Sequence, residues 1–281
     1  MSNRGPLRPE EYREPDCPLC DNPAGAQPYG RPVPQQRILA KLDDYMSRRD
    51  YAGAERHLLY WLKEAEQGRD RRGELLVLNE LVGHYRKTGS RENALPFAER
   101  AIALLKDMDF ESSISAGTTY VNAATAFSAF GENHRALVLF EKARALYESS
   151  PHTRAHLLGG LYNNMALVLK ALERYEEAFT LFEKAMTAMA EVPGGVLEQA
   201  VTCLNMADTV AARDGLEEGE ERIAQLLERA EALLRDDSAP HDGYYAFVCE
   251  KCAPCFRYYG WFAVADELEQ EAQVIYERGE G

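Results

Sequence analysis

The sequence lacks any long apolar run: no stretch approaches the roughly 18 uninterrupted apolar residues that a membrane-spanning helix needs. Its first 20 residues carry basic side chains with no apolar segment behind them, so we expect no secretion signal and a cytoplasmic location. Basic residues are also scarce, because 32 Lys and Arg stand against 46 Asp and Glu, a net charge of −14. Neither a nucleic-acid backbone nor an anionic membrane attracts such a chain at long range, so we expect neither as a partner.

Sequence patterns of catalysis are missing too. Neither a Gly-rich phosphate loop nor a GxSxG motif occurs. The segment "HTRAH" places His152 and His156 four residues apart, but it lacks the glutamate that a hydrolytic zinc helix carries between its histidines. An exposed helix start is the better interpretation of this segment. We therefore predict that the protein is not an enzyme and uses no cofactor.

What the chain does contain is an internal repeat. The segments "ENALPFAERAIALL", "HRALVLFEKARALY" and "EEAFTLFEKAMTAM" align without gaps, and their leading alanines, Ala94, Ala136 and Ala178, stand 42 residues apart both times. Each segment places small and large apolar residues on one helix face, and another apolar-periodic helix precedes it. The repeating unit is therefore predicted to be a helical hairpin.

The repeats do not begin at the start of the chain. Residues 1–35 are rich in Pro and Gly, as in "DNPAGAQPYGRPVPQQ", and show no helical period. From residue 36 onward the apolar residues recur with a helical period. We therefore predict an irregular N-terminal extension over 1–35, which contains a CxxC motif, and a helical repeat domain over 36–281.

The segments "YVNAATAFSAFGENHRALVLFEKA" and "YNNMALVLKALERYEEAFTLFEKA" resemble tetratricopeptide repeats in their small and aromatic positions. The 42-residue spacing is similar to the longer variant found in kinesin light chains and in bacterial regulators that bind peptides. Weaker copies extend the resemblance to about residues 36–278. It implies an all-α, right-handed superhelical solenoid of about six antiparallel hairpins that acts as a scaffold or adaptor for protein or peptide partners. Such repeats serve many processes, so the resemblance does not name the partner.

One polar position recurs inside these otherwise apolar helices. At 100° per residue, Asn164 falls about 200° away from Tyr162, which lies on the packed side of its helix. In a solenoid of this type the first helix of each hairpin lines the concave wall, so Asn164 is predicted to point into the groove. The predicted peptide-binding residues in three successive repeats are Thr118, Asn122, Thr125, Asn164, Leu167, Asn205 and Asp208.

Asparagine at three matched helical positions calls for a reason, because it is a poorer helix former than alanine by about half a kcal/mol. A side-chain amide carries one acceptor and two donors, which can pair with the C=O and the N–H of an extended peptide. Our hypothesis is that the amides hold a peptide backbone while neighbouring pockets supply selectivity. The alternative is that they are solvated, or bond to a neighbouring repeat and fix the stacking.

The resemblance also raises a second type of peptide site, a clamp for a C-terminal carboxylate. Such a clamp needs Lys or Arg at several inner positions, whereas the repeat of Asn205 presents Val201 and Asp208 there. The clamp is therefore not supported. An internal or cationic peptide segment fits the acidic balance of the chain better.

Six cysteines allow a rival hypothesis. Cys17 and Cys20 form one CxxC pair, and Cys249, Cys252 and Cys255 stand together in "CEKCAPC", so two pairs could build a tetrahedral zinc site. The protein would then be a metal- or thiol-dependent regulator. Against this, the C-terminal cysteines align with packed helix positions, where cysteine behaves as a small apolar residue. We favour inert thiols.

Aromatic residues crowd the end of the chain. Residues 244–262 hold eight of the 27 aromatic side chains in "YYAFVCEKCAPCFRYYGWF". We expect most of them to form the end of the core. The alternative is a surface for a partner or for a homodimer, because terminal repeats otherwise carry polar caps and large apolar patches mark contacts.

Overall fold

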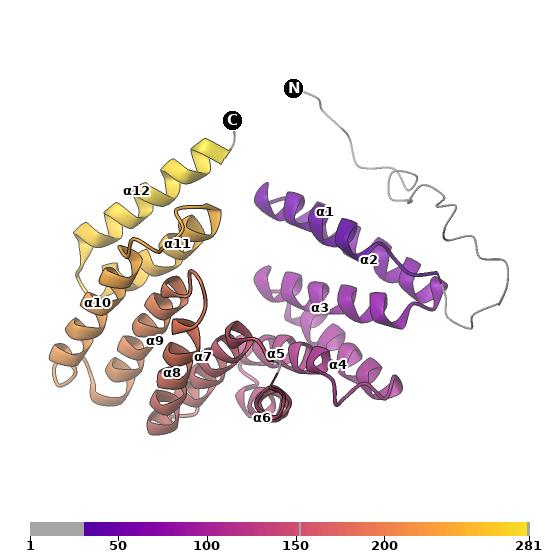
Figure 1. Ribbon diagram of the computed structural model, residues 1–281, viewed down its shortest axis with the longest axis horizontal. Coiled ribbons are helices and arrows are strands. Elements are labelled where there is room, and N and C mark those ends of the chain that lie inside the picture. The colour runs from indigo at the N-terminus through magenta and orange to yellow at the C-terminus, as the bar shows by residue number, and fades with distance from the viewer. Residues whose placement is uncertain (1–30, 152, 280–281) are drawn as a thin grey trace. The chain divides into compact units, whose positions relative to one another are not determined.

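The computed structural model describes residues 31–151 and 153–279, which contain twelve α-helices and no β-strand (Figure 1). Cys17, Cys20 and His152 lie outside this described part. The helices are α1 (Gln35–Ser47), α2 (Tyr51–Gly68), α3 (Arg71–Lys87), α4 (Arg91–Asp107), α5 (Ile114–Ala129), α6 (Asn133–Ser149), α7 (Ala155–Ala171), α8 (Tyr175–Ala190), α9 (Val196–Asp214), α10 (Glu220–Leu234), α11 (Gly243–Tyr258) and α12 (Phe262–Gly279). Their sequence as six pairs confirms the predicted all-α fold of about six helical hairpins.

The helices fall into two compact units. We call residues 1–131 the N-terminal unit, which holds α1 to α5, and residues 132–281 the C-terminal unit, which holds α6 to α12. The division falls in the turn at Gly131, whose φ of 82° lies in the left-handed region that favours glycine. It therefore separates the two helices of the third predicted hairpin. Helix α1 begins one residue before the predicted start of the repeat domain.

In the N-terminal unit, two aspartates fix the starts of successive helices. Asp50 accepts a hydrogen bond from the Gly53 amide at the start of α2, and Asp70 accepts one from the Gly73 amide at the start of α3. The second oxygen of Asp70 accepts from the Val33 amide at 2.9 Å. The Asp70 side chain therefore caps α3 and also binds the segment that leads into α1.

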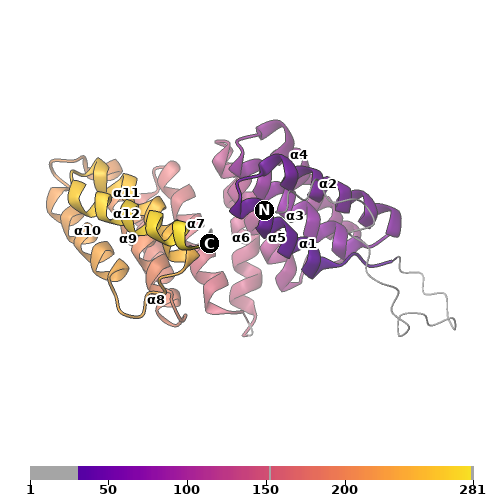
Figure 2. The ribbon, with the colours of Figure 1, turned by 90° about the horizontal axis from the view of Figure 1, so that it is seen from above.

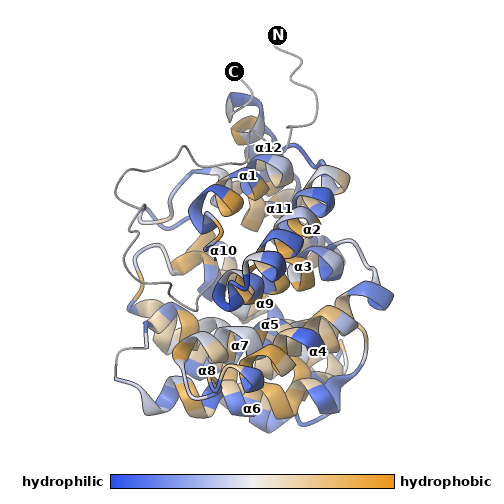
Figure 3. Cartoon of the chain, turned by 90° about the vertical axis from the view of Figure 1, so that its right-hand side faces the viewer, coloured by the Kyte–Doolittle hydropathy of each residue, from blue (hydrophilic) through white to orange (hydrophobic). Residues whose placement is uncertain are grey.

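In the C-terminal unit, the predicted packing pattern is confirmed. Ala178, Phe182 and Ala185 in α8 are fully buried, as are their counterparts Ala136, Phe140 and Ala143 in α6. Alanine at a helix crossing lets the backbones approach, and the phenylalanine one turn away fills the adjoining groove. Figure 3 shows apolar and hydrophilic residues alternating around the helices, as expected of helices that bury one side.

In the C-terminal unit, the first helices of successive hairpins contact one another. Within the described residues, α7 contacts α9 and α9 contacts α11, whereas the second helices α8, α10 and α12 make no comparable contacts with one another. Figure 2 shows α11 and α12 packed side by side as the last hairpin. We call the solvent-facing side of α7, α9 and α11 the first-helix face. Among the described helices, none is both long and apolar enough to cross a membrane.

Candidate functional site

The seven predicted peptide-binding residues are divided between the two units. Thr118, Asn122 and Thr125 lie in α5 of the N-terminal unit. Asn164 and Leu167 lie in α7 of the C-terminal unit, and Asn205 and Asp208 lie in α9. Thr118 is exposed and the other six side chains are half-buried. Each unit is therefore described as a separate candidate site.

In the N-terminal unit, Asn122 is bonded to the preceding repeat. Its Nδ2 donates to Asn79 Oδ1 of α3 at 3.1 Å. Asn79 Nδ2 in turn donates to Thr119 Oγ1 of α5 at 3.0 Å and to the carbonyl of Leu75 in its own helix at 2.9 Å. We call this side-chain junction of two amides and a threonine an amide clasp.

The C-terminal unit contains a second amide clasp of the same residue types, in which the threonine donates to the amide instead of accepting from it. Asn205 Nδ2 of α9 donates to Asn163 Oδ1 of α7 at 3.0 Å. Thr202 Oγ1 lies 3.3 Å from the same Asn163 oxygen. In both units the later helix supplies Thr-x-x-Asn, "TYVN" in α5 and "TCLN" in α9. Two of the three predicted asparagines thus form the bond between repeats that the sequence left open as an alternative.

Sequence reasoning missed the accepting residues of these clasps, Asn79 and Asn163. A signal was present, because the two stand 84 residues apart, which is twice the repeat length. Asn79 bonds to Asn122, 43 residues later, and Asn163 bonds to Asn205, 42 residues later. Neither pair joins matched repeat positions, because Asn122, Asn164 and Asn205 are the matched ones. Periodicity within a single helix does not reveal such a pair.

Asn164 differs from the other two predicted asparagines. Its side chain makes no hydrogen bond with any residue in the described part of the chain, and it is half-buried. Val121 stands midway between Asn79 and Asn163, at the corresponding position of the repeat before Asn164, and its side chain has no amide. The acceptor and both donors of Asn164 therefore remain available to a ligand.

The clasped asparagines also keep part of their bonding capacity. Asn122 and Asn205 each use one donor in the clasp, and no described residue engages their Oδ1 atoms. An amide offers one acceptor and two donors, so an acceptor and a donor are left on each. The clasp holds these groups in one orientation, which lowers the entropy cost of binding a ligand.

Asp208 ties α9 to the last hairpin. Its Oδ1 accepts from the Tyr259 hydroxyl at 2.9 Å and from the Cys255 thiol at 3.7 Å. Burial and the neighbouring Asp208 carboxylate raise the pKa of Cys255 to about 12 and the pKa of Tyr259 well above its usual value. Both groups therefore stay protonated donors at neutral pH, and the second oxygen of Asp208 has no partner among the described residues.

The cysteines of α11 have the character of core residues. Cys249 and Cys252 are buried, and so is Cys203 in α9. Burial raises the pKa of Cys203 and of Cys249 to about 11, so the thiols are protonated at neutral pH and are weak nucleophiles and metal ligands. No group of three or more His, Cys, Asp or Glu in the described residues could hold a metal ion.

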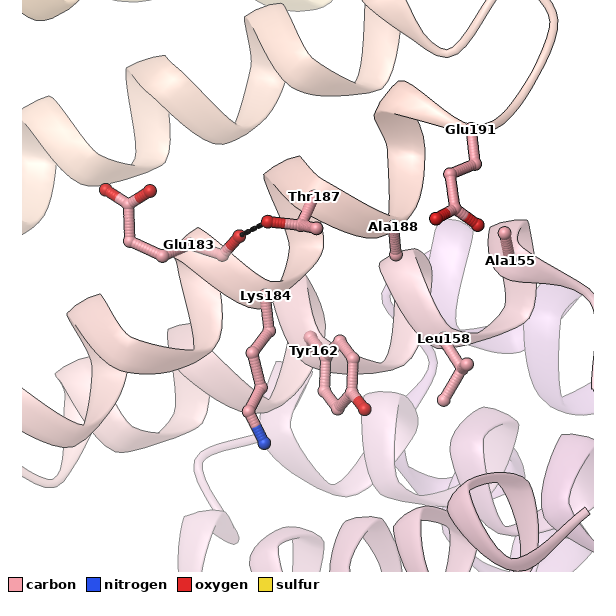
Figure 4. Close-up of a pocket in the computed structure, with 8 residues that line it drawn as sticks. All are labelled: Ala155, Leu158, Tyr162, Glu183, Lys184, Thr187, Ala188 and Glu191. Carbon is pink, nitrogen blue, oxygen red and sulfur yellow. Dashed lines mark hydrogen bonds between the residues drawn. The ribbon is translucent and has the colours of Figure 1, made fainter.

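A shallow pocket of about 450 Å³ lies on another side of α7. Figure 4 shows Tyr162 between Lys184 and Leu158, and the Tyr162 hydroxyl donates to Glu148 Oε1 of α6 at 2.9 Å. Its lining residues are Ala155, Leu158, Tyr162, Glu183, Lys184, Thr187, Ala188 and Glu191. None of these is a predicted site residue, and Tyr162 is about 200° around the helix from Asn164.

The paired helices, the recurring packing pattern and the repeated clasp define a helical repeat protein. The family model described as a tetratricopeptide repeat matches residues 157–232, which span α7 to most of α10, and this confirms the resemblance seen in the sequence. Among curated proteins, none matches the sequence.

Solved structures of low sequence identity share the fold. BtubC (BKLC) from P. vanneervenii is 17% identical with a TM-score of 0.52, and the match covers 84% of this chain and 92% of that one. NprR in complex with its cognate peptide NprX is 15% identical with a TM-score of 0.57, covering 85% and 66%. A Rap protein complexed with competence and sporulation factor is 12% identical with a TM-score of 0.52, covering 87% and 75%. At these identities the likeness establishes the helical repeat fold alone.

Proposed function

We propose that the protein is a scaffold or adaptor that captures an extended segment of a partner protein or peptide on its first helices. The observation that carries the proposal is Asn164, a half-buried amide that no described residue engages. The Asn164 amide atoms are accessible to solvent, and an extended peptide backbone offers the C=O and N–H that match them. The partner is a protein, not a nucleic acid or a membrane, and we expect to find it in the cytoplasm.

Asn164 has suitable neighbours for this role. Leu167 lies one turn further along the same side of α7 and supplies apolar contact, while Asn205 lies on α9, held by its clasp. Asp208, one turn after Asn205, offers a carboxylate oxygen. In the N-terminal unit, Thr118, Asn122 and Thr125 form a smaller polar stripe on α5, of which the Thr125 hydroxyl already donates to the Val121 carbonyl. We therefore expect the C-terminal unit to bind a peptide more tightly than the N-terminal unit does.

Two structures with this fold support the proposal, because NprR and the Rap protein were each solved with a bound peptide or factor. Their low identity carries over no residue. A homodimer through the aromatic-rich last repeat stays a second prediction. The metal- or thiol-dependent alternative loses support for the C-terminal cysteines, whose thiols are protonated, and its other half, Cys17 and Cys20, lies outside the described residues.

Selection from a random-peptide library tests the proposal. The peptide that the full chain enriches most is labelled, and its Kd is measured by fluorescence anisotropy on the wild type, Asn164→Ala and the control Thr180→Ala. Thr180 is exposed on α8, and its hydroxyl bonds only to its own helix. We expect Asn164→Ala to weaken binding by about tenfold, the loss of one or two hydrogen bonds, with Thr180→Ala unchanged. Equal affinity for all three proteins, or no enriched peptide, would overturn the proposal.

A further inference from the structure

The negative charge of the chain is concentrated in one unit. Residues 132–281 contain 27 acidic and 14 basic side chains, whereas residues 1–131 contain 19 acidic and 18 basic ones. Nearly the whole net charge of −14 therefore belongs to the C-terminal unit. A field of this sign attracts basic segments and repels acidic ones over about a Debye length.

Helix α11 presents an aromatic stripe on the first-helix face. Phe247, Lys251, Pro254 and Tyr258 follow one another at helical spacing and are all exposed, with Phe247 at 41% and Tyr258 at 70%. Tyr244 stacks on Phe247 with ring centroids 6.2 Å apart. Buried aromatic residues of the same helix, such as Tyr245 and Phe256, form the core instead.

Contacts on both flanks fix the direction in which this stripe faces. On the side toward α9, the Tyr244 hydroxyl donates to Glu198 Oε1 at 2.7 Å, and the Tyr259 hydroxyl donates to Asp208 Oδ1. On the side toward α12, Arg257 pairs with Asp266 and Glu269. The stripe lies between these two sides of α11, so neither α9 nor α12 covers it. It therefore continues the surface that Asn205 and Asp208 form on α9.

Two carboxylates border the stripe, each with one oxygen uncommitted among the described residues. Glu198 and Asp208 each accept a phenol hydrogen bond on one oxygen, and the other oxygen of each has no described partner. One ring of the stripe already binds a cation within this chain: Lys251 Nζ lies 5.6 Å from the centroid of Phe247. Aromatic faces next to carboxylates suit the aliphatic stem and charged head of Lys or Arg.

We infer that the segment bound on the first-helix face is basic, with a Lys or Arg lying on Phe247 and its charged head directed to Glu198, or lying on Tyr258 and its head directed to Asp208. This inference rests on the proposed function and specifies the chemistry of its ligand. Lys251 occupies the Phe247 ring in the free protein and repels an incoming cation. Its removal should therefore improve binding of the basic segment.

The composition of the peptides that the library selection enriches is the first readout. We expect Lys and Arg to be enriched over the input library and Asp and Glu to be depleted. The best peptide is then titrated onto the full-length wild type, Asp208→Asn, Tyr258→Ser and Lys251→Gln at two salt concentrations. We expect the first two changes to weaken binding by about five- to tenfold and Lys251→Gln to tighten it about threefold, with all affinities lower in high salt.

A charge-matched control separates the face from the general field. Glu228→Gln on α10 removes the same charge from an exposed position away from the first helices, and binding should stay within about twofold of wild type. Equal losses in Asp208→Asn and Glu228→Gln, or selected peptides that are neutral or acidic, would overturn the inference.

Dimerisation that Tyr258→Ser abolishes, without binding of basic peptides, would assign the stripe to a second copy of the chain. Binding that depends on Asn164 but not on the α11 variants would overturn only the basic chemistry, whereas no binding at all would end the proposed function as well.

Discussion

The two units share one device for stacking helices and differ in what they expose. Each contains an amide clasp, Asn79 with Asn122 in the N-terminal unit and Asn163 with Asn205 in the C-terminal unit. Among the described residues, the C-terminal unit adds the unengaged Asn164 of α7 and an aromatic stripe on α11, and its sequence carries most of the negative charge. Asparagine therefore bonds to the preceding first helix where that helix supplies an amide, whereas Asn164 has no such partner among the described residues.

The largest expected effect comes from the core of one unit. Phe182→Ala should destabilise the C-terminal unit by about 3–5 kcal/mol, because it removes a fully buried ring and leaves a cavity. The chain has one tryptophan in each unit, Trp61 and Trp261, so Trp→Phe variants with a single tryptophan report on each unit in urea titrations. We expect the Trp261 transition to shift and the Trp61 transition to stay. Equal shifts would show that the two units unfold as one.

Breaking either clasp should have the next largest effect. Asn79→Ala and Asn163→Ala each leave the amide and threonine of the later helix without their partner, at a cost of about 1–2 kcal/mol in the unit concerned. Urea titrations of the same single-tryptophan proteins measure this loss. If the two variants destabilise opposite units, or neither unit, the clasp is not a stacking device.

Lowering the pH should destabilise the N-terminal unit. Burial lowers the pKa of His57 and of His84, both of which are buried there. A folded-state pKa below the unfolded value of about 6.5 means that the unfolded chain binds more protons, so this contribution is present above pH 6.5 and is lost as the pH falls. We expect the Trp61 transition to weaken between pH 7.5 and 5.5. The double variant His57→Gln/His84→Gln should lose most of that difference, and an unchanged difference would assign it to other groups.

The smallest effect on stability should come from the residue with the largest effect on binding. Asn164→Ala removes a side chain that no described residue bonds, so the free energy of unfolding should change by less than about 0.5 kcal/mol. Its neighbour Asn163→Ala is the matched control in the same helix. Thermal unfolding of the two variants side by side measures the difference. A loss of stability in Asn164→Ala as large as that in Asn163→Ala would contradict a ligand-binding role.

The fold was predictable because its signal repeats. The 42-residue spacing of Ala94, Ala136 and Ala178 reflects a packing need that recurs at every helix crossing, and those alanines are fully buried. The division at Gly131 was not predictable from this signal, because the repeat pattern continues across it without a gap. Helical periodicity indicates which face of a helix is buried, but it does not indicate where the chain divides into compact units.

The candidate site was predictable only in part. Helical geometry placed Asn122, Asn164 and Asn205 on equivalent faces, but it could not show that two of them bond to the preceding repeat. Each bond requires an asparagine 42 or 43 residues earlier, on the preceding first helix. The aromatic residues of α11 likewise differ in burial according to their position around the helix. Tyr245 is buried and Tyr258 is exposed, which composition alone does not reveal.

Hydrogen exchange with and without the selected peptide tests the central claim most directly, because it reports on both units in one experiment. We expect slower exchange in α7, α9 and α11 when the peptide is bound, and no change in α8 or α10. At a peptide concentration close to the wild-type Kd, the same peptide should give much weaker protection in Asn164→Ala, because about tenfold weaker binding leaves most of that protein unoccupied. Protection confined to the N-terminal unit or to the second helices would overturn peptide binding on the first-helix face.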